Sequence, residues 1–350
     1  MKTSITVGMD MGDKKHNICI LDVDGEVIKR SIVSNTSISI RRYFGKLDAC
    51  LVAMEAGTHS RWVSKIIEDL GHEVLVGNPR KLRVIWDSDN KNDDKDAEML
   101  ARIARFDKEL LYPIHHRGNE TQADLAVLKS RETLVKSRAM LVTHARGLVK
   151  SCGARIKKCS TASFHKRLAT EMPEELRAAL TPILKSIENL TEQIKIYDYK
   201  LKDLIQKYPE TEKLLAVGGV GPVTVLAYIL TLEDHERFKK SRDVGPYIGL
   251  TPKRDQSGMI DKQLGITKAG DTYLRTMLVG CAQYILGHFG PECDLRRVGL
   301  KIAERGGKNG KRRAVVAIAR KLAVLLHTLW KSDEVYDPFF QKNARVKKTA

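Results

Sequence analysis

Four acidic residues occupy sequence positions from which their carboxylates could bind a metal ion together. Asp10 and Glu55 each end a short apolar segment that we predict to be a buried β-strand. Asp93 and Asp96 lie three residues apart at the start of a predicted helix, so both side chains project from one face. Carboxylates that converge repel one another, and a divalent cation relieves the repulsion. Because these ligands are hard oxygens, they favour Mg²⁺, or Mn²⁺, over zinc.

The four acids could hold two ions, which would clamp the attacking and leaving oxygens of an in-line phosphodiester displacement. The helix start also has a purely structural explanation. Asn92 or Asp93 is a good N-cap, and acids in the first turn complement the helix dipole. Both explanations stay open for Asp93 and Asp96 alone, whereas all four acids on the expected elements favour a metal-binding set.

Ser257 is a candidate nucleophile. It lies beside Gly258 in a predicted polar loop, with Lys253 and Arg254 close in sequence. A serine that attacks phosphate needs an exposed hydroxyl, a close backbone approach and cations to hold the phosphate. Ser-Gly is also a common turn sequence, and that alternative stays open. No G-x-S-x-G elbow surrounds Ser257, so acyl transfer is not indicated.

Gly219 and Gly221 belong to a glycine-rich segment, residues 217–221, that precedes a predicted helix. The segment has the character of a helix-hairpin-helix turn, in which backbone N–H groups face a phosphate without reading bases. A glycine-rich turn between two packed helices would have the same pattern. The segment is not a P-loop, because Gly-Lys-Ser/Thr is missing.

Positive charge is concentrated in two parts of the chain. The 350 residues carry 61 Lys and Arg against 43 Asp and Glu, a net charge of +18. Residues 119–158 contribute +6 and residues 296–350 contribute +11. A polyanion such as nucleic acid explains this clustering, although a solvated helix face with a basic tail stays open. In the second segment the candidate contacts are Lys308, Lys311, Arg312 and Arg313.

Composition excludes several classes of protein. Hydrophobic residues make up 42% and charged residues 30%, which indicates a globular chain. Apolar runs fall well short of the ~20 residues of a membrane-spanning helix, so no membrane partner is expected. The N-terminus lacks the apolar core of a secretory signal, and we expect a cytoplasmic protein. The six cysteines form no C-x-x-C pair and are expected to be reduced thiols rather than zinc ligands or disulfides.

The elements that must position the acids follow from hydrophobic periodicity. An Asp24-Gly25 turn joins two of the strands as a hairpin. The order suits a mixed α/β sheet with helices on both faces, in which the first and fourth strands lie side by side. The predicted strands are residues 4–10, 16–22, 27–33, 50–55 and 73–76, and the predicted helices are residues 38–47, 60–70 and 93–105.

The chain becomes mainly helical after Pro113. Long helices are predicted over residues 119–151 and from Pro173 to Tyr208, joined by a basic loop. They form either an antiparallel coiled-coil hairpin or part of a plain helical bundle. An amphipathic helix is predicted over residues 314–330. The predicted division is a catalytic α/β domain, a helical segment, a domain that carries Ser257, and a basic C-terminal helix and tail, over residues 1–112, 113–209, 210–295 and 296–350.

The motifs together resemble those of the DEDD-type transposases of bacterial insertion sequences, the insertion-sequence one-ten family, which includes the pilin-gene invertases. The resemblance covers nearly the whole chain. It rests on Met54-Glu55-Ala56 and on Lys91-Asn-Asp93-Asp-Lys-Asp96-Ala97 in the first half. In the second half it rests on Gly219-Val-Gly-Pro222, Gly249-Leu-Thr-Pro252, Gln256-Ser257-Gly258 and Leu274-Arg275.

The resemblance implies a fold and a mechanism. Asp10, Glu55, Asp93 and Asp96 would be the metal-binding set of a RuvC-like, RNase H-like domain. Ser257 would attack DNA and form a covalent phosphoserine link. The family works as an oligomer, here a dimer or tetramer, and is guided by a structured noncoding RNA, the bridge RNA, that pairs with donor and target DNA. A bacterial, nucleoid-associated protein is expected.

Three functional hypotheses follow. The first is an RNA-guided transposase, or recombinase, that moves its own element through Ser257 with Mg²⁺-assisted chemistry. The second is a metal-dependent RuvC-like junction endonuclease in which water is the nucleophile and Ser257 only forms a turn. The third is a nucleic-acid-binding protein without activity, such as a decayed transposase.

Overall fold

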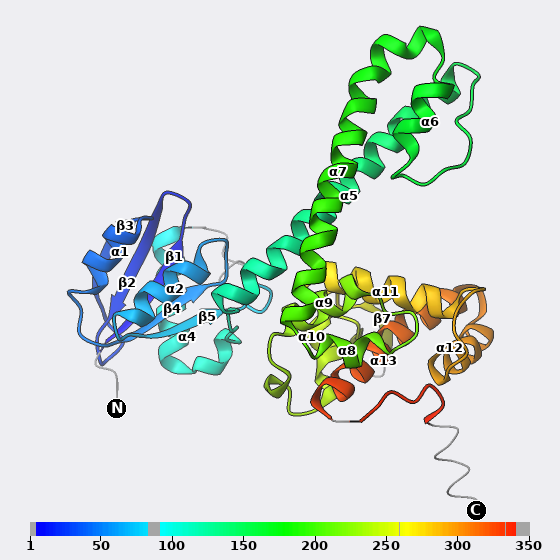
Figure 1. The fold of residues 1–350 in the computed structure, drawn as a ribbon. Helices are drawn as coiled ribbons and strands as arrows, with labels where there is room; N and C mark the ends of the chain where they lie inside the picture. The colour runs from blue at the N-terminus through cyan, green and yellow to red at the C-terminus, as the bar shows by residue number, and fades with distance from the viewer. Residues whose placement is uncertain (1–4, 83–91, 259, 333, 341–350) are drawn as a thin grey trace, which may run out of the picture. The chain divides into compact units, whose positions relative to one another are not determined.

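The computed structural model describes residues 5–82, 92–258, 260–332 and 334–340. The chain divides into two compact units, Met1–Arg117 and Gly118–Ala350 (Figure 1). Each unit has its own hydrophobic core. Among the described residues, no helix is both long and apolar enough to cross a lipid bilayer. The finer division at residues 112, 209 and 295 stays a prediction.

The first unit is built on a five-stranded mixed sheet of order β3-β2-β1-β4-β5. β2 pairs antiparallel with β1 and β3, whereas β4 runs parallel to β1 and β5. The predicted neighbourhood of the first and fourth strands is confirmed, and the topology is RNase H-like. The strands are β1 Thr6–Met11, β2 Lys15–Leu21, β3 Val27–Ser34, β4 Leu51–Glu55 and β5 Glu73–Gly77.

Helices cover both faces of this sheet, as predicted. On one face α1 (Ser37–Phe44) and α2 (Ser60–Asp69) bury their apolar residues against Met9 and Val52. On the other face lies α4 (Asp93–Phe106), followed by the short 3₁₀ helix η1 (Lys108–Leu111).

Gly8 allows α4 to lie directly on β1. A Cβ atom at Gly8 would come within 1.8 Å of the Ala97 carbonyl oxygen and 2.7 Å of the Ala101 amide nitrogen. Any side chain there would therefore push α4 away from the sheet. The small residues Ala97, Ala101 and Ala104 occur at helical spacing on the side of α4 that is buried. Close contact between backbones thus holds this helix in place.

Two long helices open the second unit, α5 (Asn119–Ser151) and α7 (Arg177–Lys207). The predicted loop between them contains a short helix, α6 (Phe164–Glu171), because Phe164 and Leu168 bury their side chains against α5 and α7. The 3₁₀ helix η2 (Glu174–Leu176) precedes α7, so α7 begins later than predicted. One half of the pair packs against α6 in a small core, and the other half joins the main core. The coiled-coil geometry stays a prediction.

The main core of the second unit is helical. α13 is central to it, because Ile318, Leu322 and Leu326 are fully buried. The segment predicted as a basic helix and tail is therefore part of the core. The helices are α8 Thr211–Leu215, α9 Pro222–Leu232, α10 Val244–Ile248, α11 Thr272–Leu286, α12 Asp294–Arg305 and α13 Gly310–Lys331, with the 3₁₀ helices η3 His235–Arg237, η4 Ser241–Asp243 and η5 Gly307–Asn309.

His327 makes the stability of this core depend on pH. Its ring is fully buried and lies 3.0 Å from both the Ser241 hydroxyl and the His235 carbonyl oxygen. Burial lowers the pKa of His327 below its usual value, so the folded state favours the neutral ring.

The pH effect has a definite sign. Below about pH 6.5, the ordinary pKa of histidine, the unfolded chain binds the proton more readily than the folded chain. We expect the unfolding free energy in urea to fall as the pH is lowered from 7.5 to 5.5. The fall in unfolding free energy should be smaller in His327→Gln, because glutamine cannot titrate. In His288→Gln, which alters an exposed histidine, the fall should be as large as in the wild type. An equal fall in all three proteins would contradict the assignment.

Candidate functional site

Asp10 and Glu55 meet at the ends of two parallel strands. The register pairs Met9 with Met54, so the next residues along β1 and β4 are Asp10 and Glu55. Both line one pocket of about 370 Å³, together with Met11, Asp13, His59 and residues 56–58. The carboxyl ends of β1 and β4 and the loops that follow them thus form a shared acidic pocket.

The two acids project from the face of the sheet that α4 covers. Side chains along a strand alternate between faces, so Asp10 shares a face with Gly8, and Glu55 shares one with Ala53. Gly8 lies against the backbone of α4, and Ala53 belongs to the core cluster that contains Leu100 of α4. α4 therefore covers the same face from which both carboxylates project.

Asp93 and Asp96 lie in the first turn of this helix, in line with its buried stripe, although Asp93 is exposed. They precede Ala97 and Leu100 by four residues each, about one turn, so they continue the stripe that faces the sheet. The cap is Asn92, whose side chain accepts from the Asp94 N–H at 3.0 Å, so Asp93 is not the N-cap. Asn92 therefore performs the capping role, and neither Asp93 nor Asp96 is needed for it. Both carboxylates lie at the end of the helix that is near Asp10.

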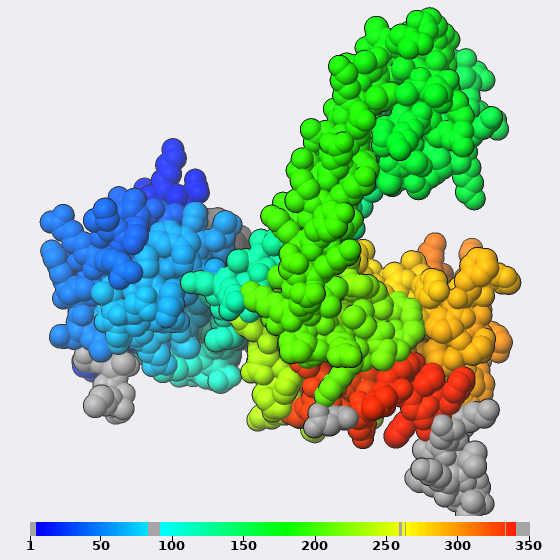
Figure 2. All heavy atoms as spheres, in the orientation of Figure 1, coloured from blue at the N-terminus to red at the C-terminus, as the bar shows by residue number. Residues whose placement is uncertain are grey.

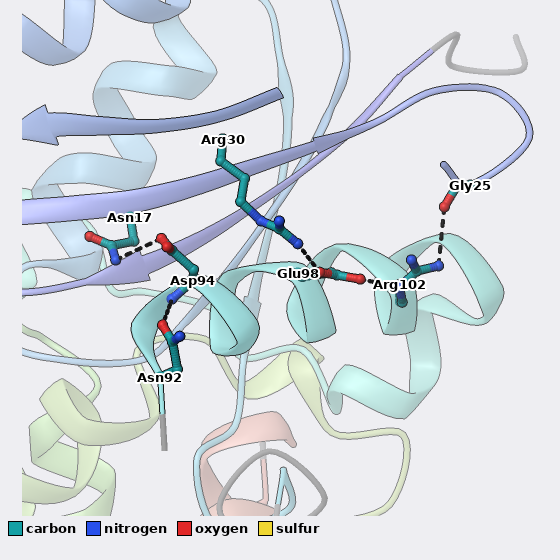
Figure 3. Close-up of polar contacts among 7 residues, drawn as sticks. All are labelled: Asn17, Gly25, Arg30, Asn92, Asp94, Glu98 and Arg102. Carbon is teal, nitrogen blue, oxygen red and sulfur yellow. Dashed lines mark hydrogen bonds and ion pairs between the residues drawn. The ribbon is translucent and has the colours of Figure 1, made fainter. Parts of the chain in front are cut away.

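Hydrogen bonds fix the start of α4 over the sheet (Figure 3). The Asn17 amide donates to the Asp94 carboxylate at 3.1 Å, and Asn17 pairs with Asp10 across β1 and β2. The Asp94 carboxylate thus holds the helix rather than extending the acidic pair. Further along α4, Glu98 accepts from both Arg30 and Arg102, and Arg102 also donates to the Gly25 carbonyl oxygen.

Removing this anchor should disturb the acids more than the fold. Asn17→Ala deletes one hydrogen bond to a carboxylate and should lower the unfolding free energy by about 1.5 kcal/mol. The matched control is Thr36→Ala, which removes the N-cap of α1 on the opposite face at a similar cost of about 1 kcal/mol. We expect metal-dependent DNA cleavage to fall in Asn17→Ala and to persist in Thr36→Ala. Equal activity in the two variants would show that this anchor does not position the acids.

Ser257 lies on a β-hairpin in the second unit. β6 (Pro252–Ser257) and β7 (Ile260–Ile266) pair antiparallel, so the predicted polar loop is wrong. The side chains of β6 are all exposed, and such a ribbon lacks the apolar alternation by which strands are recognised. Ser257 is the last residue of β6 and is exposed beside Gly258, whose φ is +55°. The hairpin presents the hydroxyl at its tip.

An ion pair braces the hairpin across its strands. The Arg254 guanidinium donates to both carboxylate oxygens of Asp261, at 2.8 and 2.6 Å. This contact lowers the pKa of the Asp261 carboxyl, and both residues are exposed. Arg254 therefore has a local partner, and its predicted contact with nucleic acid stays a prediction, as does that of the exposed Lys253.

Comparisons with known proteins bear on both regions. A DEDD-type family profile described as a transposase matches residues 7–153, and a profile described as transposase IS116/IS110/IS902 family matches residues 211–296. The transposase for insertion sequence element IS1111A of Coxiella burnetii is 30% identical over 96% of this chain and 92% of its own. The chain belongs to this family of insertion-sequence transposases. Transposases break and rejoin DNA strands.

Two further relatives are more distant. The transposase for insertion sequence element IS1328 of Yersinia enterocolitica is 28% identical over 79% of this chain and 82% of its own. The pilin gene-inverting protein of Moraxella lacunata is 24% identical over 76% of this chain and 75% of its own. The first profile covers the acidic pocket and the second covers the Ser257 hairpin, so family membership spans both regions.

The acids of this transposase suit a divalent cation in kind. Asp10 and Glu55 offer hard oxygen ligands in one pocket, which fits a divalent cation. Among the residues that the structure describes, no three acidic, histidine or cysteine side chains are grouped closely enough to hold a metal. The structure thus brings Asp10 and Glu55 together, and places Asp93 and Asp96 on the facing helix. Lys91 of the sequence motif lies outside the described residues.

Sequence reasoning missed two residues of the acidic pocket. His59 Nε2 lies 3.3 Å from an Asp13 carboxylate oxygen, and the Trp62 indole N–H donates to His59 Nδ1 at 3.3 Å. The indole contact assigns the ring proton to Nε2, which donates to Asp13. Their positions in the sequence were the available signal. Asp13 lies three residues after Asp10, and His59 lies four residues after Glu55.

A buried arginine anchors the base of the hairpin. Arg275 of α11 is only 8% exposed and donates to the Ile248 and Ala269 carbonyl oxygens at 2.9 and 2.7 Å. These carbonyls lie just before β6 and just after β7. Arg275, part of the family motif, thus ties both ends of the hairpin to one helix.

The two glycines of the glycine-rich turn differ in their surroundings. Gly219 has a φ of +89°, and a Cβ there would lie 2.8 Å from Ile285 of α11, so close packing requires glycine. The structural explanation therefore accounts for Gly219. Gly221 is the exposed N-cap of α9 and has open space around its Cα, so its predicted phosphate contact stays a prediction.

The four basic candidates near the C-terminus are exposed and lie on two helices, η5 and α13. Lys308 lies in η5, whereas Lys311, Arg312 and Arg313 lie in the first turn of α13. This helix was predicted to begin at Ala314, but it begins at Gly310. The earlier start is hard to predict, because its first turn contains cations, which are unfavourable at the positive end of a helix dipole, and glycines precede them. The burial of Gly310 and Ala314 against neighbouring helices decides the start instead.

Proposed function

We propose that this transposase cuts and rejoins DNA through a phosphoserine intermediate at Ser257, with Mg²⁺-assisted chemistry at Asp10, Glu55, Asp93 and Asp96. The exposed position of Ser257 at the tip of a braced hairpin carries the proposal. A nucleophile that must reach a phosphodiester inside DNA needs a hydroxyl that projects beyond the protein surface.

The proposed reaction is a transesterification. Ser257 Oγ attacks the phosphorus and loses its proton, while the bond from phosphorus to one deoxyribose oxygen breaks and that oxygen gains a proton. Attack by the hydroxyl of a second strand reverses these steps, so the phosphodiester is restored and the serine is released. The divalent cation would stabilise the charge on the phosphate oxygens. Asp10 and Glu55 would hold it from the ends of β1 and β4.

Partners follow from charge. The two basic segments are proposed to contact the backbones of donor and target DNA and of a structured noncoding guide RNA, the bridge RNA. We also propose a homo-oligomer, a dimer or tetramer, because two DNA partners must each be cut and then exchanged.

One observation favours a second candidate function. Asp10 and Glu55 share a pocket within the first unit, where they could position a water molecule without Ser257. The protein would then be a metal-dependent junction endonuclease, and the hairpin would only bind DNA.

A covalent-adduct assay tests the proposal. The protein would be co-expressed with the DNA that flanks its gene and purified with any bound RNA. It would then be incubated with labelled donor and target DNA and Mg²⁺, and run on a denaturing gel. Label that travels with the protein supports the serine mechanism. Cleaved DNA without adduct would support the endonuclease, and neither product would indicate a nucleic-acid-binding protein without activity.

A further inference from the structure

A large groove lies beside α13 in the second unit. Its volume is about 1450 Å³. One wall is α13, another is the base of the β6–β7 hairpin, and a third is the segment from Glu334 to Phe340. The Asp294 N–H of α12 donates to the Pro338 carbonyl oxygen at 2.8 Å, which holds that segment in place. In Figure 2 the end of the described chain, drawn in red, lies on the surface of this unit. We name this feature the α13 groove.

The floor of the α13 groove is apolar. Val316, Val324 and Leu325 of α13 line it and are half-buried. Val316 and Leu325 also pack against the main core, so each side chain is only partly covered from within. Leu264 of β7 adds an apolar side chain that is 49% exposed. Half-exposed aliphatic side chains gathered in one groove indicate a surface that a ligand covers.

The rim of the α13 groove is cationic. Arg242, Arg312, Arg313, Arg320 and Lys321 line it, and none of the five forms an ion pair with another described residue. Arg312 and Arg320 are eight residues apart on α13, which separates them by about 12 Å along the helix axis. Arg312 and Arg313 also occupy the first turn of α13, which contains no acid, so a bound anion would relieve their repulsion with the helix dipole.

We propose that the α13 groove binds an unpaired DNA strand, with its phosphates on the arginine rim and its bases on the apolar floor. In duplex DNA the base faces are covered by stacking, so only a strand with free bases can bury the floor. The inference rests on the proposed function, because strand exchange requires unpaired DNA near the nucleophile. Pro252 and Ile266 at the base of the hairpin line the same groove, so a strand bound there leads to the ribbon that carries Ser257.

The test is binding of fluorescein-labelled (dT)12 and of a 12-base-pair duplex, measured by fluorescence anisotropy on the full-length protein. Arg320→Ala/Lys321→Ala should weaken (dT)12 binding at least tenfold and flatten its salt dependence. Leu264→Ser should weaken (dT)12 binding about fivefold and leave duplex binding within twofold. The matched control is Lys200→Ala/Lys202→Ala, which removes two exposed lysines of α7 and should bind both probes as the wild type does.

Several outcomes would overturn the proposal. One is an equal loss for strand and duplex in Leu264→Ser, and another is unchanged (dT)12 binding in the Arg320/Lys321 variant. Tenfold tighter binding of U12 than of (dT)12 would assign the groove to RNA. A changed oligomeric state in sedimentation, with unchanged (dT)12 binding, would make it a subunit interface.

Folding and the proposed function are checked separately. Arg242→Ala, in a different element, repeats the rim test if the α13 variant is not folded by circular dichroism. Adduct formation by the wild type reports the proposed function. If adducts form while all variants bind (dT)12 normally, the groove proposal alone is wrong. If no adduct forms but the rim variants lose (dT)12 binding, the groove proposal stands without the serine mechanism.

Discussion

Ser257→Ala is expected to abolish the covalent protein–DNA adduct and to lower strand joining by roughly 10³-fold or more, as removal of a covalent nucleophile commonly does. The side chain is exposed at the tip of the β6–β7 hairpin and contributes nothing to a core, so the variant should fold as the wild type does. The measurement is the amount of labelled DNA that migrates with protein on a denaturing gel after incubation with Mg²⁺.

The matched control is Gln256→Ala, which changes the exposed neighbour on the same strand and leaves the serine in place. It should retain most of the adduct. Ser257→Cys offers a further check, because a thiol can attack phosphorus with altered kinetics while the backbone is unchanged. Full strand cleavage by Ser257→Ala would instead identify water as the nucleophile and would favour the endonuclease.

Asp10→Asn and Glu55→Gln are each expected to lower cleavage by about 10²–10³-fold, the usual cost of losing one group that stabilises transition-state charge. Each change keeps the size of the side chain and removes its charge, so the effect reports on cation binding rather than on packing. Removing Mg²⁺ with EDTA should have the same effect on the wild type, and added Mn²⁺ should restore activity to it.

Glu73→Gln is the matched control for the carboxylates. Glu73 begins β5 at the opposite end of the same parallel strands, pairs with Leu51 and forms an ion pair with Lys108 at 2.5 Å. Its loss should leave cleavage unchanged. If Asp10→Asn and Glu55→Gln were as active as Glu73→Gln, the acidic pocket would not be the site of metal-assisted chemistry.

Local patterns in the sequence predicted most of the first unit correctly. The strand over residues 50–55 is observed as Leu51–Glu55, and the helix over residues 60–70 as Ser60–Asp69. Both depend on apolar spacing within about ten residues, which the chain carries locally. The β6–β7 hairpin was missed for the opposite reason. Its described side chains are almost all exposed, and its ends are held by Arg275, which lies outside the hairpin.

The sequence by itself determined the candidate acids and the candidate serine, the clustering of positive charge, and the family. It did so because residue types, spacing and net charge do not depend on how the chain is folded. Only the tertiary structure decided which groups share a surface. The Asn17–Asp94 bond joins residues 77 positions apart, and the close approach of α4 to Gly8 orients the acids on one face. The α13 groove likewise depends on packing between distant segments. The periodicity of a helix predicts its apolar face, but not which part of that face neighbouring elements cover.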